Sequence, residues 1–156
     1  MKFKIEQIAL CPKDPEAAIT LLTEMGAGEW ARDHVVAGGY AQHLIGVNEA
    51  DLSFDYEMLD TPASELEILH YTSGRNWMEG QNRVSHLGMH CTEVDLGYWY
   101  KFFARLNIPI AQEVITSTHT NPVIAGKRKY HYVIFDTFDI LSVDIKFIVR
   151  HDIPSI

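Results

Sequence analysis

Four polar residues stand among apolar neighbours in segments that have the composition of β-strands: Gln7, Glu67, His86 and Asp144. Burying such a group without a partner costs roughly a few kcal/mol, so each of them needs one. An imidazole, an amide oxygen and two carboxylates can share one divalent cation. This set of donors suits zinc, manganese, iron, cobalt, nickel or magnesium better than copper. The four residues are therefore candidates for a single metal site.

His86 also has an ordinary structural interpretation. It lies in the segment Arg83–Cys91, where the alternation of a strand puts it on one face together with Gly88 and His90. A histidine with small or apolar neighbours on a strand is often a hydrogen-bonded core residue. Taken alone, this segment favours the core interpretation.

The other three residues have structural alternatives too. Gln7 could face solvent, and so could Glu67, because Glu65 has the same strand parity. Asp144 could pair with Lys146, two residues along the same face, or with an arginine beyond it. Ion pairs of that kind on a sheet face are common and weak. The individual residues leave these alternatives open.

The chain repeats one order of elements. Phe3–Cys11 is predicted as a strand, and Asp14-Pro15 supplies the N-cap and first residue of a helix that ends at Gly26. The second half begins with the strand Val84–Cys91, followed by a helix over Asp95–Leu106. Further strands follow each helix, and those predicted are Trp30–Val36, Tyr40–Val47, Asp51–Leu59, Glu65–Tyr71, Ile110–Ser117, Lys129–Asp136 and Ile140–Val149.

The four polar residues match between the halves. Gln7 and His86, in the two opening strands, are 79 residues apart, and Glu67 and Asp144, in the two closing strands, are 77 apart. Two such similar offsets from different elements indicate a duplicated module. The predicted fold is α+β, with two tandem βαβββ modules forming an open, curved mixed-sheet barrel. The first module spans 1–72, the linker 73–83 and the second module 84–150, together one compact domain with a common trough.

Composition and net charge limit the classes of function that the protein can have. The 156 residues are 47% hydrophobic and 22% charged, which is typical of a globular domain. The net charge of -8 argues against nonspecific nucleic-acid binding, which needs a basic surface. No apolar run approaches the roughly 20 residues of a membrane-spanning helix. The N-terminus has charge where a signal peptide would need an apolar core, so we expect a cytoplasmic protein.

The chain resembles the vicinal oxygen chelate superfamily. This group includes glyoxalase I, methylmalonyl-CoA epimerase, extradiol dioxygenases, fosfomycin-resistance proteins and bleomycin resistance proteins. The resemblance extends over Phe3–Val149 and implies paired βαβββ modules around a divalent metal that chelates two adjacent substrate oxygens. The features that carry it are the openings Gln7-Ile-Ala-Leu…Asp14 and His86-Leu-Gly-Met…Glu93, and the closing residues Glu67 and Asp144.

The resemblance places Gln7, Glu67, His86 and Asp144 on four metal-ligand positions, for one zinc, nickel, cobalt, manganese or iron ion. It also implies two catalytic carboxylates. Glu67 would be base and ligand, and Asp144 its partner across the trough. Asp144 departs from the pattern, because glutamate is usual there. Its shorter side chain could coordinate through water or leave a coordination position open.

The implied activity is that of a glyoxalase-like lyase, isomerase or epimerase. It would act on a small substrate with adjacent oxygens through a metal-stabilised enediolate. An extradiol-type dioxygenase is an alternative, but that chemistry uses two histidines and one carboxylate. Gln7 stands where the first histidine would, so His90 would have to be recruited. A non-enzymatic protein that binds bleomycin-like antibiotics is a further alternative, against which the four polar positions argue.

Four more residues are candidates for contact with the small-molecule substrate. His90 and Lys146 share strand faces with proposed ligands. Tyr130 and Tyr132 alternate with His131, and the sequence does not decide which of the two faces lines the trough. A homodimer formed through an edge strand would fit the resemblance, and the sequence does not decide that either.

Overall fold

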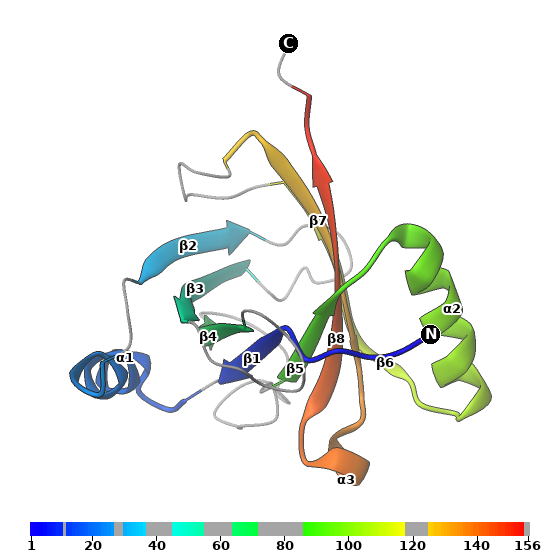
Figure 1. The fold of residues 1–156 in the computed structure, drawn as a ribbon, viewed down its shortest axis with the longest axis horizontal. Coiled ribbons are helices and arrows are strands. Elements are labelled where there is room, and N and C mark those ends of the chain that lie inside the picture. The colour runs from blue at the N-terminus through cyan, green and yellow to red at the C-terminus, as the bar shows by residue number, and fades with distance from the viewer. Residues whose placement is uncertain are drawn as a thin grey trace.

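Each half of the chain begins with a short strand and a helix and ends in longer strands (Figure 1). The computed structural model describes residues 1–10, 12–26, 30–36, 45–54, 64–71, 86–117 and 125–154, and of 31–36, 45–54, 64–65 and 69–71 it describes the backbone alone. The first half contains β1 (Gln7–Leu10), α1 (Pro15–Glu24), β2 (Ala31–Val36), β3 (Ile45–Phe54) and β4 (Ser64–Tyr71). The second contains β5 (His86–His90), α2 (Glu93–Arg105), β6 (Ile110–Thr116), β7 (Arg128–Phe135), α3 (Phe138–Leu141) and β8 (Asp144–Asp152).

Side-chain caps fix where the two long helices begin. Asp14 Oδ1 accepts a hydrogen bond from the backbone N–H of Ala17 at 3.0 Å, one position before Pro15. Thr92 Oγ1 accepts one from the backbone N–H of Asp95 at 3.1 Å. Each cap satisfies an N–H that the helix itself leaves without a partner. Because Thr92 is the cap, α2 begins two residues before the predicted start.

The eight strands within the described residues belong to one open mixed sheet in the order β2-β3-β4-β1-β5-β8-β7-β6. Within each half the first strand lies parallel to the last, β1 beside β4 and β5 beside β8. The halves join at the centre, where β1 and β5 pair antiparallel. The duplicated βαβββ order and the curved, open sheet confirm the predicted fold class. This topology puts the opening and closing strands of both halves, which carry the four predicted ligands, next to one another.

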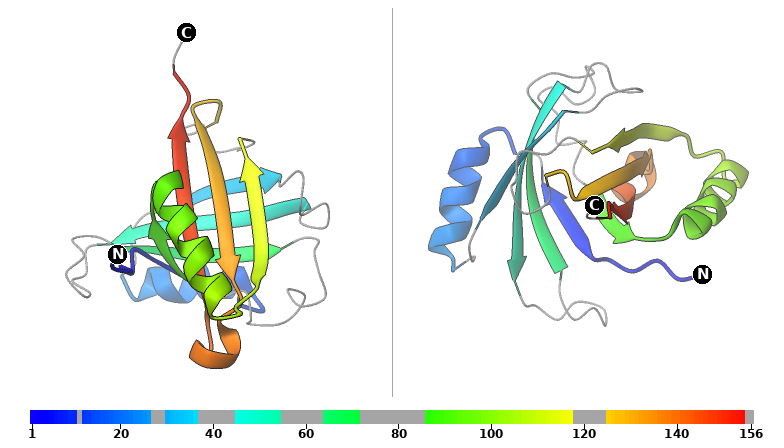
Figure 2. Two further views of the ribbon diagram at one scale, coloured as in Figure 1. Left: turned by 90° about the vertical axis from the view of Figure 1, so that its right-hand side faces the viewer. Right: turned by 90° about the horizontal axis from the view of Figure 1, so that it is seen from above.

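The two long helices lie on opposite outer sides of the curved sheet, α1 against the first half and α2 against the second (Figures 1 and 2). The main apolar core lies under α2. Leu96, Trp99 and Phe103 of the helix are buried against the outer face of β5, β7 and β8. The Trp99 and Phe147 rings stack with their centroids 4.9 Å apart. Because this core occupies the outer face, the inner face remains for polar residues.

The structure corrects the bounds of three predicted strands. Tyr40–Val47 and Asp51–Leu59 were predicted as separate strands, whereas β3 continues through Asn48 and Glu49, which pair with β2 on one side and β4 on the other. The last strand was predicted to start at Ile140. That residue lies in α3, whose C-cap residue Ser142 has a left-handed φ of 62°. β8 then runs beyond the predicted end, because its last residues pair with β7.

Several predictions fall on residues outside the described ranges, among them the hairpin turn at Gly38-Gly39 and the linker at 73–83. The module boundaries stay predictions for the same reason. In the described part of the chain, no helix combines the length and the apolar character needed to span a bilayer.

Candidate active site

The four predicted ligands lie buried on the inner face of the sheet where the two halves meet. Ala9 of β1 pairs with Glu67 on one side and with His86 on the other, and His86 pairs with Asp144. Residues directly opposite each other point to the same face. Gln7, two residues before Ala9, points the same way. Gln7 is 4% exposed and the three others are 1% exposed each, so the solvent-facing alternatives for Gln7 and Glu67 do not hold.

His86 is the centre of this group. Its Nε2 lies 3.0 Å from Gln7 Oε1 and 3.3 Å from Glu67 Oε2. A neutral imidazole offers one donor and one acceptor, and here a single nitrogen faces two oxygens. The arrangement therefore gathers an amide oxygen, a carboxylate oxygen and an imidazole nitrogen at one point.

Gly88 makes room for the Gln7 side chain. The two residues are cross-strand partners in β1 and β5. A Cβ added to Gly88 would lie 3.0 Å from both Cβ and Oε1 of Gln7, closer than real Cβ atoms normally approach other atoms. A side chain at position 88 would therefore push the amide away from His86.

Lys146 of β8 brings a positive charge into the same group. Its Nζ lies 3.5 Å from Glu67 Oε2, and the residue is 4% exposed. The same Nζ lies 4.6 Å from the centre of the Tyr132 ring, a cation–π contact. Tyr130 stacks on Tyr132 with ring centroids 5.2 Å apart. The two tyrosines therefore lie on the inner face of the sheet, together with Lys146.

Asp144 is positioned by the turn that precedes β8. Its Oδ1 accepts a hydrogen bond from the backbone N–H of Thr137 at 3.2 Å. The Thr137 hydroxyl in turn donates to the carbonyl of Val143 at 2.8 Å. The first bond fixes the Asp144 carboxylate at the start of β8, where Asp144 is the register partner of His86.

His90, also predicted to contact substrate, lies at the exposed end of β5. Its backbone N–H donates to Glu6 Oε2 at 2.6 Å, and its ring Nδ1 lies 3.2 Å from the same oxygen. The structure thus groups Gln7, Glu67, His86, Lys146 and the two tyrosines, whereas it places His90 with Glu6.

Searches of protein-family models and of curated proteins found no match to the chain. Solved structures do match. A Streptomyces coelicolor methylmalonyl-CoA epimerase variant in complex with 2-nitronate-propionyl-CoA is similar with a TM-score of 0.58 and 13% identity, over 96% of this chain and 98% of that one. A methylmalonyl-CoA epimerase bound to methylmalonyl-CoA and NH4+ gives a TM-score of 0.57 and 14% identity, over 94% and 93%. The Mycobacterium tuberculosis enzyme gives 0.53 and 8%, over 96% and 91%.

These structures have the same paired modules, and they belong to the superfamily that the sequence resembles. The chain has the vicinal oxygen chelate fold. At such low identity the likeness extends to the fold alone. The chemistry must therefore be argued from this chain's own side chains.

The donors present fit the divalent ion that the vicinal oxygen chelate fold implies. Two donors that bind one zinc-sized ion at about 2.0–2.2 Å lie about 2.8–3.6 Å apart for angles between about 90° and 109°. The contacts of 3.0 and 3.3 Å at His86 Nε2 are of this size. In the described residues, no group of three or more His, Cys, Asp or Glu side chains is arranged to hold a metal. The convergent set differs because it includes the amide of Gln7.

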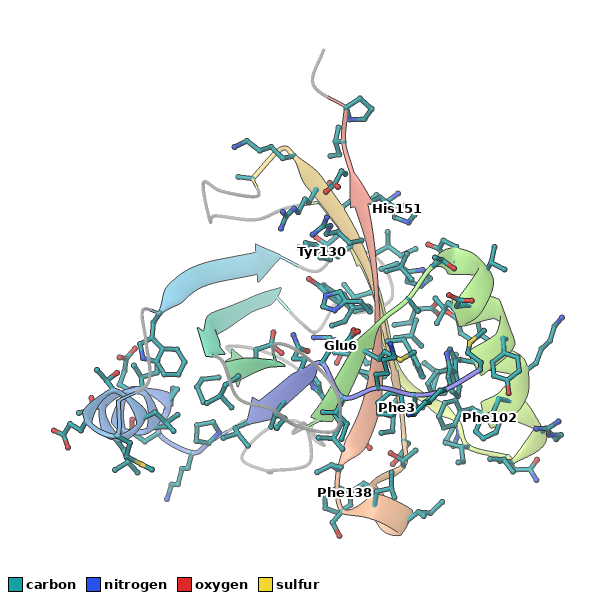
Figure 3. The ribbon with its side chains drawn as sticks, in the orientation of Figure 1. Phe3, Glu6, Phe102, Tyr130, Phe138 and His151 are labelled. Atoms are coloured by element: carbon teal, nitrogen blue, oxygen red, sulfur yellow. The ribbon has the colours of Figure 1, made fainter. Side chains whose placement is uncertain are left out.

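A second polar cluster, which was not predicted from the sequence, lies on the outer face of the sheet. His131 Nε2 lies 2.8 Å from Glu113 Oε1, which also accepts a hydrogen bond from the Tyr100 hydroxyl. His131 Nδ1 lies 3.3 Å from Glu93 Oε1, and His151 Nε2 lies 3.0 Å from the same oxygen. Figure 3 shows His151 on the side of β8 that faces α2, and Tyr130 on the other side. The sequence held one sign of this cluster: His131 alternates with Tyr130 and Tyr132 along the strand, so it must point to the opposite face of the sheet.

Electrostatics in this outer cluster follow from its contacts. The hydrogen bond to His151 lowers the pKa of Glu93 most, and the hydrogen bond to His131 lowers it further. Burial, followed by the hydrogen bond to Glu113, raises the pKa of Tyr100. Burial also raises the pKa of the nearby Cys91 thiol to about 11, with smaller contributions from the charges of Asp95 and Glu93. The cluster connects α2 to β6, β7 and β8 on the outer face of the sheet.

Replacing Gly88 by alanine is expected to destabilise the protein by about 1–3 kcal/mol, because the added methyl group crowds Gln7. Gly97 is the matched control. It lies in α2 with nothing within 4 Å of an added Cβ, so Gly97→Ala should stabilise by about 0.5–1 kcal/mol through helix propensity. Urea unfolding of both variants gives the free energies. Equal effects of the two substitutions would contradict the close approach at Gly88.

The Cys91 thiol should react slowly with iodoacetamide. With a pKa of about 11 rather than 9.0, the thiolate fraction at pH 8 is about 100-fold smaller. Mass spectrometry of the Cys91 peptide after timed alkylation measures the rate in the folded protein, and the same peptide in guanidinium is the control. Similar rates under the two conditions would show that burial does not raise this pKa.

Proposed function

We propose that this protein is a metal-dependent enzyme that moves a proton on the carbon next to a carbonyl group, as an epimerase or isomerase does. One observation carries the proposal. Oxygens of Gln7 and Glu67 converge on Nε2 of His86 among buried residues on the inner face of the sheet, with spacings that suit a shared divalent ion. The substrate would be a small molecule with two adjacent oxygens.

In this proposal Gln7, Glu67 and His86 hold the ion, and Asp144 completes the set directly or through water. The bound ion would polarise the substrate carbonyl and so lower the cost of removing the neighbouring proton. The Glu67 carboxylate would take that proton. Asp144, on the far side of His86 in the register, would return one to the opposite face of the carbon. An exchange of faces through two bases needs one proton-transferring group on each side of the carbon, and these two carboxylates would supply them.

The first substrates to test come from the proteins of similar fold. Those structures are methylmalonyl-CoA epimerases in complex with 2-nitronate-propionyl-CoA and with methylmalonyl-CoA. Both are coenzyme A thioesters, and in methylmalonyl-CoA the carbon between the two carbonyl groups carries an acidic proton. The buried ammonium of Lys146 beside the proposed ligands would favour a substrate that carries negative charge.

The alternatives differ in what they demand of this site. An extradiol-type dioxygenase would need His90 as a second imidazole ligand, and the ring of that residue lies beside Glu6. A bleomycin-like antibiotic binder would not need the convergent donors at all. The cytoplasmic location and the homodimer stay predictions from the sequence.

The metal content of purified protein tests the proposal. Wild type should bind about one equivalent of a divalent ion, and His86→Ala should lose it because the central donor is gone. His90→Ala, a histidine-to-alanine change in the same strand, should keep it. In deuterated water, exchange of the methylmalonyl-CoA α-proton should fall at least about 100-fold in Glu67→Gln, with circular dichroism confirming that each variant folds.

Three results would contradict the proposal. Equal metal content in the His86→Ala and His90→Ala variants would show that His86 is not a metal ligand. Oxygen uptake with catechols would favour the dioxygenase. Tight binding of a small molecule without metal and without proton exchange would favour the binding protein.

A further inference from the structure

The Lys146 ammonium and the proposed metal would both bind the same carboxylate oxygen of Glu67. Glu67 Oε2 lies 3.5 Å from Lys146 Nζ and 3.3 Å from His86 Nε2. An ion held by Glu67 and His86 must therefore sit close to a positively charged nitrogen. The ammonium and the metal are alternatives for neutralising one carboxylate.

The buried position of the pair makes that neutralisation necessary. Glu67 is 1% exposed and Lys146 is 4% exposed, so water does little to stabilise either charge. A buried charge that loses its partner is strongly destabilising, whereas a buried pair is tolerated. Glu67 thus needs a cation whether or not a metal is bound.

The fold gives the Lys146 ammonium a second contact beside the first. Its Nζ lies over the ring of Tyr132, which is supported from behind by the stacked ring of Tyr130. The ammonium can therefore move toward the aromatic face without losing every favourable contact.

We propose that Lys146 is a resident counter-ion of Glu67 that competes with the metal. In the metal-free protein it neutralises the carboxylate and keeps the trough folded. Metal binding repels the ammonium toward Tyr132. This inference rests on the proposed function, because it takes the metal site to be the one around His86.

If Lys146 competes with the metal, removing its charge must raise the affinity of the protein for zinc. Lys146→Met removes the charge and keeps an unbranched side chain of similar length. It should tighten zinc binding at least about tenfold, since competition for Glu67 and repulsion of the ion both disappear. Lys146→Arg keeps the charge and should bind about as weakly as wild type. Lys129→Met, at an exposed lysine of β7, removes the same net charge elsewhere and should change nothing.

Zinc affinity measured by competition with a chromophoric chelator decides among these outcomes. Zinc bound equally tightly by wild type and K146M, or more weakly by K146M, would overturn this inference and leave the proposed function intact. If His86→Ala binds zinc as well as wild type, or if no variant binds it, both fail together.

A thermal-unfolding cycle in chelator tests the metal-free half of the proposal without relying on zinc. Lys146→Met should lower the melting temperature because it leaves Glu67 buried without its cation, and adding Glu67→Gln should restore most of the loss. A double variant that loses as much as the sum of the two single variants would overturn the pairing. Zinc should raise the melting temperature of Lys146→Met by more than that of wild type.

Discussion

The buried carboxylate of Glu67 is the constraint on which the candidate site depends. A charge almost completely removed from water requires a cation and hydrogen-bond donors close by, and the chain supplies them from strands of both halves. His86 comes from β5 and Lys146 from β8, each within 3.5 Å of the same oxygen. The duplicated fold thus matters chiefly because it brings these strands together around one carboxylate.

The two faces of the sheet have different roles: the outer face packs against the apolar core, and the inner face carries the polar residues of the candidate site. The aromatic core under α2 accounts for the packing of the outer face, with Trp99 and Phe147 at its centre. Because that face supplies much of the apolar burial, the inner face can hold groups that would weaken an ordinary core. The central pairing of β1 with β5 sets their register, and Gly88 lets Gln7 reach His86 across it.

Much of this arrangement could be predicted from the sequence. Alternation and the matched offsets identified the repeat and the four polar residues, because a polar residue in an apolar strand is visible without knowledge of its partners. The pairing of strands across the sheet could not be predicted from the sequence. The contact of Lys146 with Glu67 depends on the order of four strands, and the position of the tyrosines depends on which face of β7 turns inward. The outer cluster around His131 escaped notice for the same reason.

The errors in secondary structure have related causes. Asn48 and Glu49 suggested a break, but hydrogen bonding to strands on both sides keeps β3 continuous. Ile140 and Leu141 are apolar and were assigned to the last strand, although the left-handed Ser142 separates them from it. In both places contacts between distant residues, or a single backbone conformation, outweighed local composition.

Anomalous diffraction from crystals soaked in zinc would test the central claim most directly. The account predicts one strong peak within bonding distance of Gln7 Oε1, a Glu67 carboxylate oxygen and His86 Nε2, with the Lys146 ammonium displaced toward the Tyr132 ring. A zinc peak elsewhere, or an empty trough in which Lys146 keeps its contact with Glu67 at saturating zinc, would contradict it.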